Sequence, residues 1–186
     1  MNKLLFATLA AAAVAPVLAQ TPPAAPPSAA QTPPAAQAIS GTQAPVPAAR
    51  GPSLKLALEA AQKAVNTCKG LDQKVGVTVV DSAGVPKVVL ATDGASTRGV
   101  ASSTNKALTA LVFSSATSVL AEKIKSDPAL AERVAANPNS NTRAGGLLLK
   151  VGDDVIGAIG VGGAKGSEKD EACALAGLKS VQHRLR

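Results

Sequence analysis

Proline is distributed very unevenly along this chain, and its distribution limits the part that can fold. Nine of the 13 prolines lie in residues 20–52, within Ala/Pro/Gln/Thr repeats. Proline lacks a backbone N–H and fixes φ, so such a stretch forms no helix interior and behaves as a semi-extended spacer. We therefore predict one compact domain over residues 53–186, preceded by a disordered linker that acts as a passive tether rather than a recognition motif.

Residues 1–19 have the pattern of a secretory signal peptide. Lys3 precedes an apolar run from Leu4 to Ala15, and the small residue Ala19 ends the segment. The run is shorter than the roughly 20 apolar residues that a membrane-spanning helix needs. We therefore expect cleavage after Ala19 and a periplasmic or secreted protein with no membrane span after cleavage.

The charge and composition restrict the class of partner. The chain has 19 Lys and Arg against 12 Asp and Glu, and loss of Lys3 would leave about +6 (18 − 12). This modest excess favours a small anionic ligand. The absence of Tyr and Trp argues against nucleic acid, because single-strand binders stack bases on aromatic side chains. One His and two Cys are too few for a Cys/His zinc module.

Periodicity predicts a helix followed by a hairpin at the start of the domain. Ser53 can cap a helix whose apolar positions recur every three or four residues, and Gly70 is positioned to end it. Alternating valines then predict strands over 74–80 and 85–91, joined by the turn 81–84.

The rest of the domain repeats this scheme. Helical patterns cover the stretch around Ala107 and residues 116–125 and 128–136. A second hairpin has arms at 147–151 and 155–161, and a capping-box-like sequence from Ser167 begins a last helix. Two hairpins separated by helices predict an α+β domain with an antiparallel sheet, and argue against a parallel Rossmann sheet.

A glycine-rich run over 157–166 is the strongest candidate for ligand binding. Backbone N–H groups between a strand and a helix start can hold an anion, so Gly160, Gly162, Gly163 and Lys165 are candidate ligand-binding residues. Neither the P-loop nor the dinucleotide-binding motif fits this run. The alternative is that the glycines let strand, turn and helix approach closely.

Six further residues could contribute to a ligand or metal site. Asp93, at a strand end, could place a carboxylate at a pocket mouth, although a helix-entry turn also explains it. Lys106 and Thr109 lie in a mostly apolar helix, where a lysine can also extend from the flank to solvent. Arg98 could complement an anion, as could Arg143. The last candidate, His183, is the only imidazole available to a metal, and its position near the end also suits a surface residue at a helix C-terminus.

Cys68 and Cys173 lie in the first and last predicted helices. In an exported protein two cysteines are more often bridged than free. If the two helices lie antiparallel on one face of the sheet, the cysteines meet, and a bridge closing about 105 residues (173 − 68) would stabilise by up to roughly 4–5 kcal/mol. Two buried, reduced thiols are the alternative. Redox catalysis is disfavoured because there is no C-x-x-C pair.

Several stretches together resemble the GlcG/HbpS family, a DUF336-like group that includes secreted haem-binding proteins and glycolate-operon accessory proteins. The match extends in order over 53–182. Its segments are Val77–Gly84, Asp93–Ala95, Lys106–Ala110 with Phe113, Gly145–Gly146, Val155–Gly163, Lys169–Ala174 and Ala176–Leu178.

The resemblance implies a profilin-like domain with a five-stranded antiparallel sheet, homo-oligomers, and in some members binding of haem or a related tetrapyrrole. It also implies, for some relatives, a membrane sensor protein as partner. This chain has no Tyr and its only Met is the initiator, so the strong axial ligands available to haem iron are His183 or a cysteine. Cysteine ligation would conflict with a disulfide.

Three functions follow as hypotheses. The first is an exported binding protein for haem or a similar anionic ligand, possessing no catalytic residues. The second is an enzyme that degrades haem or acts on small hydroxy acids, although no acid/base pair or nucleophile–His arrangement supports it. The third is a non-catalytic oligomeric structural or signalling partner.

Overall fold

The computed structural model describes residues 49–186 of the chain, so the predicted signal peptide and most of the linker lie outside the described residues. The domain begins with α1 (Leu54–Gly70), and the Ser53 side chain accepts a hydrogen bond from the Leu56 N–H, as predicted for its cap. The helix ends at Gly70, as predicted, and a residue in the left-handed conformation follows two positions later at Asp72 (φ 53°). Asp tolerates that conformation through its short polar side chain.

Two antiparallel hairpins form one sheet, which confirms the predicted α+β class. The strands are β1 (Gly76–Asp81), β2 (Pro86–Ala91), β3 (Gly146–Val151) and β4 (Asp154–Gly162), in the order β2-β1-β4-β3. The five strands implied by the family resemblance are not found in residues 49–186, where the sheet has four. The long segment between β2 and β3 forms helices instead of a further strand.

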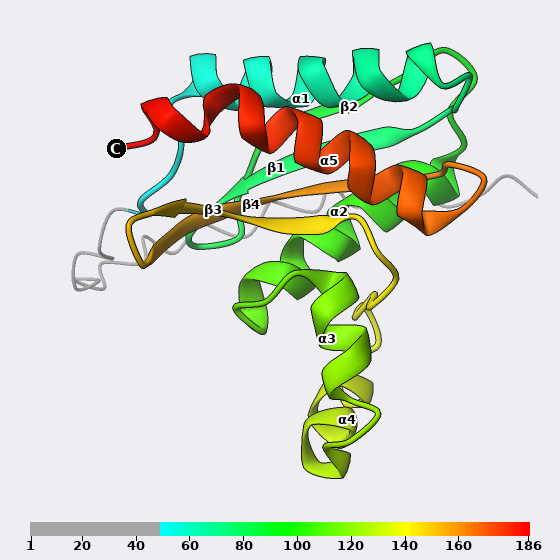
Figure 1. Ribbon diagram of the computed structural model, residues 1–186, viewed down its shortest axis with the longest axis vertical. Coiled ribbons are helices and arrows are strands. Elements are labelled where there is room, and N and C mark those ends of the chain that lie inside the picture. Colours follow the sequence, from blue (N-terminus) through cyan, green and yellow to red (C-terminus); the bar gives the residue numbers. More distant parts are fainter. Residues whose placement is uncertain (1–48) are drawn as a thin grey trace, which may run out of the picture. The chain divides into compact units, whose positions relative to one another are not determined.

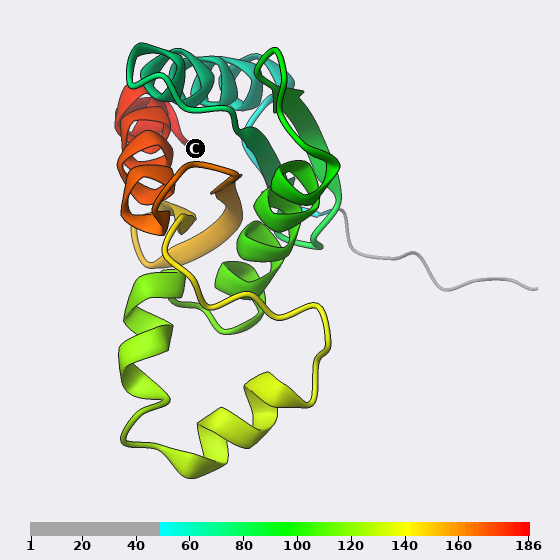
Figure 2. The ribbon, with the colours of Figure 1, turned by 90° about the vertical axis from the view of Figure 1, so that its right-hand side faces the viewer.

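Helices cover both faces of this sheet (Figure 1). On one face α1 lies beside α5 (Ser167–Val181), and on the other lies α2 (Thr97–Val112). Figure 2 shows α3 (Thr117–Lys123) and α4 (Pro128–Ala135) extending away from the sheet beyond α2. A short 3₁₀ turn, η1 (Gln182–Arg184), follows α5.

The alternation of β1 explains why both faces of the sheet are apolar. Val77 and Val79 belong to the larger core beneath α1 and α5, while Val80 belongs to a smaller core beneath α2. Every residue of β1 is therefore buried, as expected for a central strand covered on two sides. β4, its neighbour, is buried along almost its whole length for the same reason.

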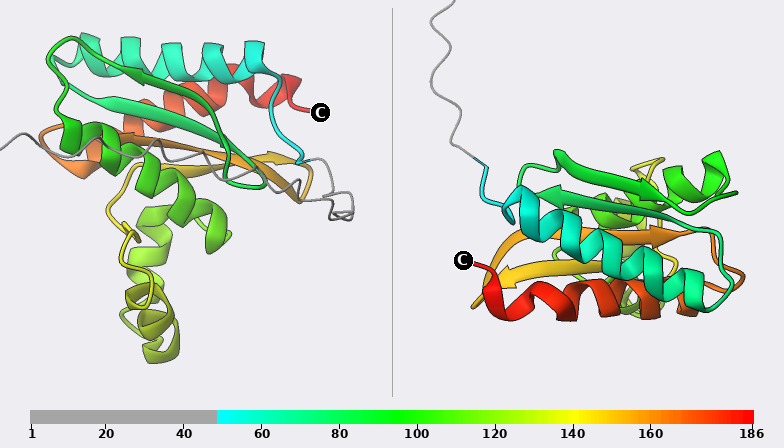
Figure 3. Two further views of the ribbon diagram at one scale, coloured as in Figure 1. Left: turned by 180° about the vertical axis from the view of Figure 1, so that it is seen from behind. Right: turned by 90° about the horizontal axis from the view of Figure 1, so that it is seen from above.

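The helices α1 and α5 run antiparallel, with the C-terminus beside the start of α1 (Figure 3). This arrangement brings Cys68, near the end of α1, to Cys173 in the second turn of α5, and the two form a disulfide with a Cα–Cα distance of 5.5 Å. The predicted bridge is confirmed, and the alternative of two reduced thiols is wrong for the structure as described.

Candidate functional site

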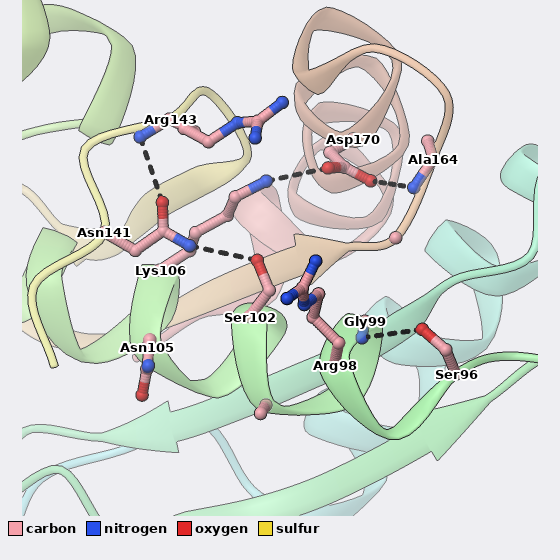
Figure 4. A pocket seen from close by; sticks show the side chains of 12 residues that line it. Ser96, Arg98, Gly99, Ser102, Asn105, Lys106, Asn141, Arg143, Ala164 and Asp170 are labelled. Carbon is pink, nitrogen blue, oxygen red and sulfur yellow. Dashed lines mark hydrogen bonds and ion pairs between the residues drawn. The ribbon is translucent and has the colours of Figure 1, made fainter.

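A pocket of about 550 Å³ opens beside the first half of α2. Three segments form it: α2 with its cap, the loop that leads into β3, and the turn between β4 and α5 (Figure 4). The lining residues are Ser96, Arg98, Gly99, Ala101, Ser102, Asn105, Lys106, Asn141, Arg143, Gly163, Ala164 and Asp170. Eight of these twelve residues are polar or charged, in contrast to the apolar cores on either side of the sheet.

A buried ion pair forms the inner wall of the pocket. Lys106 Nζ lies 2.7 Å from Asp170 Oδ2, and the two side chains are only 2% and 4% exposed. The other carboxylate oxygen of Asp170 accepts a hydrogen bond from the Ala164 N–H at 2.9 Å. Because Lys106 belongs to α2 and Asp170 to α5, the pair connects helices from opposite faces of the sheet.

Gly145 leaves the space in which this pair forms. A Cβ at this position would lie 3.0 Å from Lys106 Nζ and 2.9 Å from the Asp170 Cβ, and the residue has a φ of +128°. A side chain would therefore be strained and would push into the ion pair. Glycine at this position allows the lysine to pass the sheet and reach the carboxylate.

Burial lowers the pKa of Lys106 below the ordinary lysine value, because desolvation disfavours the ammonium form. The hydrogen bond and the charge of Asp170 oppose this shift, and so does the charge of Glu171. The positive charge of Arg143 lowers the pKa further. Lys106 therefore gives up its proton more readily than an exposed lysine does.

Two arginines give the pocket its excess of positive charge. Figure 4 shows the guanidinium groups of Arg98 and Arg143 extending toward the Lys106–Asp170 pair from different sides. Within residues 49–186 neither side chain forms an ion pair. Three cations and one carboxylate line the pocket, so the net charge of the lining is +2 (3 − 1).

Asn141 fixes the loop that carries Arg143. Its backbone N–H donates to Thr109 Oγ1 at 2.9 Å, and its side-chain amide donates to Ser102 Oγ at 3.0 Å. Its side-chain oxygen accepts from the Arg143 N–H at 3.2 Å. Two of these bonds tie the loop to α2 and the third orders the loop itself, which holds Arg143 over the pocket.

The structure brings some of the sequence-predicted site residues together and separates others. Arg98, Lys106 and Gly163 line the pocket. Thr109 lies outside the lining and holds the Asn141 loop. Asp93 lies exposed in the turn between β2 and α2, and Lys165 is exposed beyond the pocket rim. Asp170 and Asn141 were not predicted as site residues. Lys106 gave a signal for Asp170, because a lysine in an apolar helix needs an acidic partner when it is buried.

The glycine-rich turn makes different contacts from those of an anion cradle. A Cβ on Gly160 would collide with the Ser103 carbonyl and lie 2.6 Å from the Ala107 N, so this glycine lets α2 pack directly on β4. A Cβ on Gly162 would meet Ser102 at 2.8 Å. The Lys165 N–H donates to Gln73 Oε1 at 2.8 Å. These contacts match the alternative in which the glycines permit close packing.

His183 lies in η1, at the opposite end of α5 from Asp170. Their separation of 13 positions (183 − 170) corresponds to roughly 20 Å along a helix axis, at about 1.5 Å per residue. In residues 49–186 no group of three or more His, Cys, Asp or Glu side chains is placed to hold a metal ion. His183 therefore cannot reach the pocket from its position here.

A four-stranded antiparallel sheet between helices, with a cationic pocket at one end of α2, defines an α+β domain with a candidate anion-binding site. The family model described as "Haem degrading protein HbpS-like" matches residues 53–179. The chain therefore belongs to the HbpS-like family. No curated protein matches it significantly.

Solved structures agree with this assignment. HbpS is 31% identical, with a TM-score of 0.64 over 79% of this chain and 98% of HbpS. A double mutant of HbpS from Streptomyces reticuli is 32% identical, with a TM-score of 0.65 over 82% and 98%. The Klebsiella pneumoniae protein ORFY, a DUF336 protein, shares the fold at 23% identity, with a TM-score of 0.66 over 80% and 100%.

The pocket residues fit one part of haem and not another. Arg98, Arg143 and Lys106 are suited to carboxylates such as the haem propionates. Haem iron is usually held by His, Cys, Met or Tyr, and the lining contains none of these. Cys68 and Cys173 are bonded to each other. The residues present therefore fit the carboxylates and do not fit the iron.

None of the helices in residues 49–186 combines the length and the apolar character needed to span a membrane.

Proposed function

We propose that this protein binds an anionic ligand through its carboxylates, and that haem or a related tetrapyrrole is the class of ligand to test first. The observation that carries the proposal is the positive charge of the pocket. Within the described part of the chain, Arg98 and Arg143 line it without forming an ion pair, and with Lys106 and Asp170 they give the lining a net charge of +2 (3 − 1). A guanidinium forms two parallel hydrogen bonds with a carboxylate, which makes arginine well suited to this recognition.

Two comparisons support the choice of haem. The family model is described by a haem-related activity, and a neighbour of the same fold, PduOC, was crystallised as a heme complex. PduOC is 23% identical, with a TM-score of 0.63 over 70% of this chain and 94% of PduOC. Because the lining lacks a usual iron ligand, binding would depend on the carboxylates and on contact with the pocket wall.

The proposal includes export of the protein to the periplasm or the medium, as the first 19 residues indicate. It also includes a homo-oligomer and a membrane sensor protein as partner, both of which derive from the family resemblance. In that setting a ligand-binding domain joined to a Pro/Ala-rich linker would serve haem or iron handling or sensing.

A haem titration of the domain, followed by the Soret band, tests the proposal. We expect a saturable, shifted band at about one haem per chain or per dimer. Arg98→Glu and Arg143→Glu should each weaken binding by about tenfold or more, since a hydrogen bond to a charged group contributes about 1.5–3 kcal/mol. Weak association without saturation would contradict haem binding and favour the third hypothesis, an oligomeric partner.

Two charge-matched variants complete this titration. Lys123→Glu, on the exposed face of α3, changes the net charge equally and should leave the affinity unchanged. Lys165→Glu tests the glycine-rich turn, because Lys165 is exposed outside the lining. Unchanged affinity in Lys165→Glu would exclude this turn from the site, and a tenfold loss would include it.

Haem degradation is the second candidate function, because the family description names it. Adding a reductant and oxygen to the haem-loaded protein distinguishes the two. A binding protein should keep its Soret band under these conditions, whereas an enzyme should lose it faster than free haem does.

A further inference from the structure

The buried Lys106 amine is a chemical group that carboxylate binding alone does not require. Lys106 lines the pocket at its inner wall, while the other lysines of the described residues lie at least partly exposed. Its Nζ contacts the Asp170 carboxylate at 2.7 Å and lies on the side of the pocket toward which Arg98 and Arg143 extend. A nucleophile, a proton acceptor and two anion-binding groups therefore surround one cavity.

We propose that Lys106 forms an imine with the carbonyl group of a small 2-oxo acid whose carboxylate is held by Arg98 and Arg143. This inference rests on the proposed anion-binding role of the same arginines. It adds a requirement for a carbonyl carbon next to the carboxylate. A 2-oxo acid has this arrangement, so binding of its carboxylate would bring the carbonyl toward the amine.

The Lys106–Asp170 pair can supply the protons that this reaction needs. Asp170 accepts a proton from the Lys106 ammonium, and the free amine attacks the carbonyl carbon, forming the C–N bond. The carbonyl oxygen takes up one proton from the attacking nitrogen and one from Asp170, and leaves as water when the C–O bond breaks. The overall change is ammonium plus ketone giving protonated imine plus water, with Asp170 again a carboxylate and no oxidant or reductant.

The surroundings favour this chemistry over that of an exposed lysine. Burial and the charge of Arg143 lower the pKa of Lys106, which increases the fraction of amine near neutral pH. The side chain is 2% exposed, so little water reaches the nitrogen to reverse the condensation. Asp170 and Glu171 oppose the pKa shift and keep part of the population protonated.

Reductive trapping with pyruvate and borohydride tests the inference. Intact mass should show one reduced pyruvate adduct, and peptide mapping should place it at Lys106. Because the pKa of Lys106 is lowered and the two arginines hold the carboxylate beside it, we expect Lys106 to carry most of the label near neutral pH. Labelling spread evenly over exposed lysines would overturn the inference.

Matched variants and a matched ligand separate the contribution of the Lys106 amine from that of the arginines. Lys106→Arg keeps the positive charge beside Asp170 and should abolish the label, while Lys123→Arg should not change it. Arg98→Gln should reduce the rate. Acetone, a ketone without a carboxylate, should label Lys106 no faster than the exposed lysines. Equal labelling by acetone and pyruvate would overturn the role of the arginines.

Calorimetric titration with pyruvate and with haem separates this inference from the proposed function. If either anion binds, and the binding depends on Arg98, but borohydride traps no adduct at Lys106, the imine is wrong and the anion pocket stands. If neither anion binds and nothing is trapped, both proposals are wrong. Trapping at Lys106 with a dependence on Arg98 supports both.

Discussion

Lys106 and Asp170 are each almost fully removed from water, so each charge depends on the other. Removing two charges from water costs several kcal/mol per ion, and only a close, well-bonded partner offsets this cost. Asp170 meets the condition with bonds to both Lys106 and the Ala164 N–H. Lys106 has one such bond, and its lowered pKa reflects incomplete compensation of its desolvation.

Replacement of Lys106 by methionine should therefore destabilise the fold. The Lys106→Met variant leaves the Asp170 carboxylate buried without its partner, and we expect a loss of about 3–5 kcal/mol in the free energy of unfolding, measured by urea denaturation. Lys125→Met, which breaks an exposed pair with Glu122, should cost less than about 1 kcal/mol. Equal losses in the two variants would contradict a stabilising role of the buried pair.

The same pair predicts a pH dependence of stability. Because the pKa of Lys106 is lowered in the folded protein, the unfolded chain binds more protons between that pKa and the ordinary lysine value near 10.4. Stability attributable to Lys106 should therefore rise with pH through this window. The difference in the free energy of unfolding between wild type and Lys106→Met should therefore increase as the pH rises across the alkaline range. A difference that stays constant with pH would contradict the lowered pKa of Lys106.

At the scale of elements, glycine and cysteine hold the helices in place by different means. The absence of a side chain at Gly160 lets α2 lie directly against β4, which places the first half of α2 beside the pocket. On the other face the Cys68–Cys173 disulfide joins α1 to α5. An Arg184–Glu59 pair joins α1 to the turn η1 that follows α5. Asp170 is therefore carried by a helix held at both ends.

Loss of the disulfide should lower the melting temperature. The bridge joins residues 105 positions apart, and the chain-entropy model gives a stabilisation of about 4.7 kcal/mol for a loop of that size. Cys68→Ser should melt at a lower temperature than wild type under oxidising conditions. Reductant should lower the melting temperature of wild type but leave that of Cys68→Ser nearly unchanged. Two free thiols in a titration of the native wild-type protein would contradict the bridge.

At the scale of the whole molecule, the sequence predicts three parts with different physical roles. The described domain contains both cores, the disulfide and the pocket. Residues 20–52 carry nine of the 13 prolines, a composition typical of a linker, and residues 1–19 have the charge and hydropathy of an export signal. From the order of signal peptide, linker and domain we predict an exported protein whose ligand-binding domain is joined to a passive tether.

Processing of the N-terminus tests that order directly. Expressed in a bacterial host, the full chain should appear in the periplasm or the medium, and N-terminal sequencing should begin at Gln20. Replacing Leu4 and Leu5 by aspartate should retain the protein in the cytoplasm, because charges interrupt the apolar run that export requires. Recovery of an uncleaved chain in the cytoplasm of the wild type would contradict export.

The sequence by itself determined the local elements of this protein. Alternating valines, the Ser53 cap and the turn glycines predicted both hairpins and the flanking helices, because these patterns depend on neighbours a few residues apart. The two cysteines and the order of elements were sufficient for the disulfide and the fold class. The end of α1 at Gly70 was predicted correctly, whereas the first strand, predicted over 74–80, lies at Gly76–Asp81.

Only the tertiary structure decided the candidate site. Lys106 and Asp170 are 64 residues apart in the chain. Nothing in either local sequence shows that their side chains contact each other in the space that Gly145 leaves open. The position of Arg143 depends on the hydrogen bonds of Asn141 to α2. The packing of α2 against β4 depends on Gly160, a contact between elements that the local sequence does not show. Local patterns specify elements, whereas a pocket forms where elements distant in the chain meet.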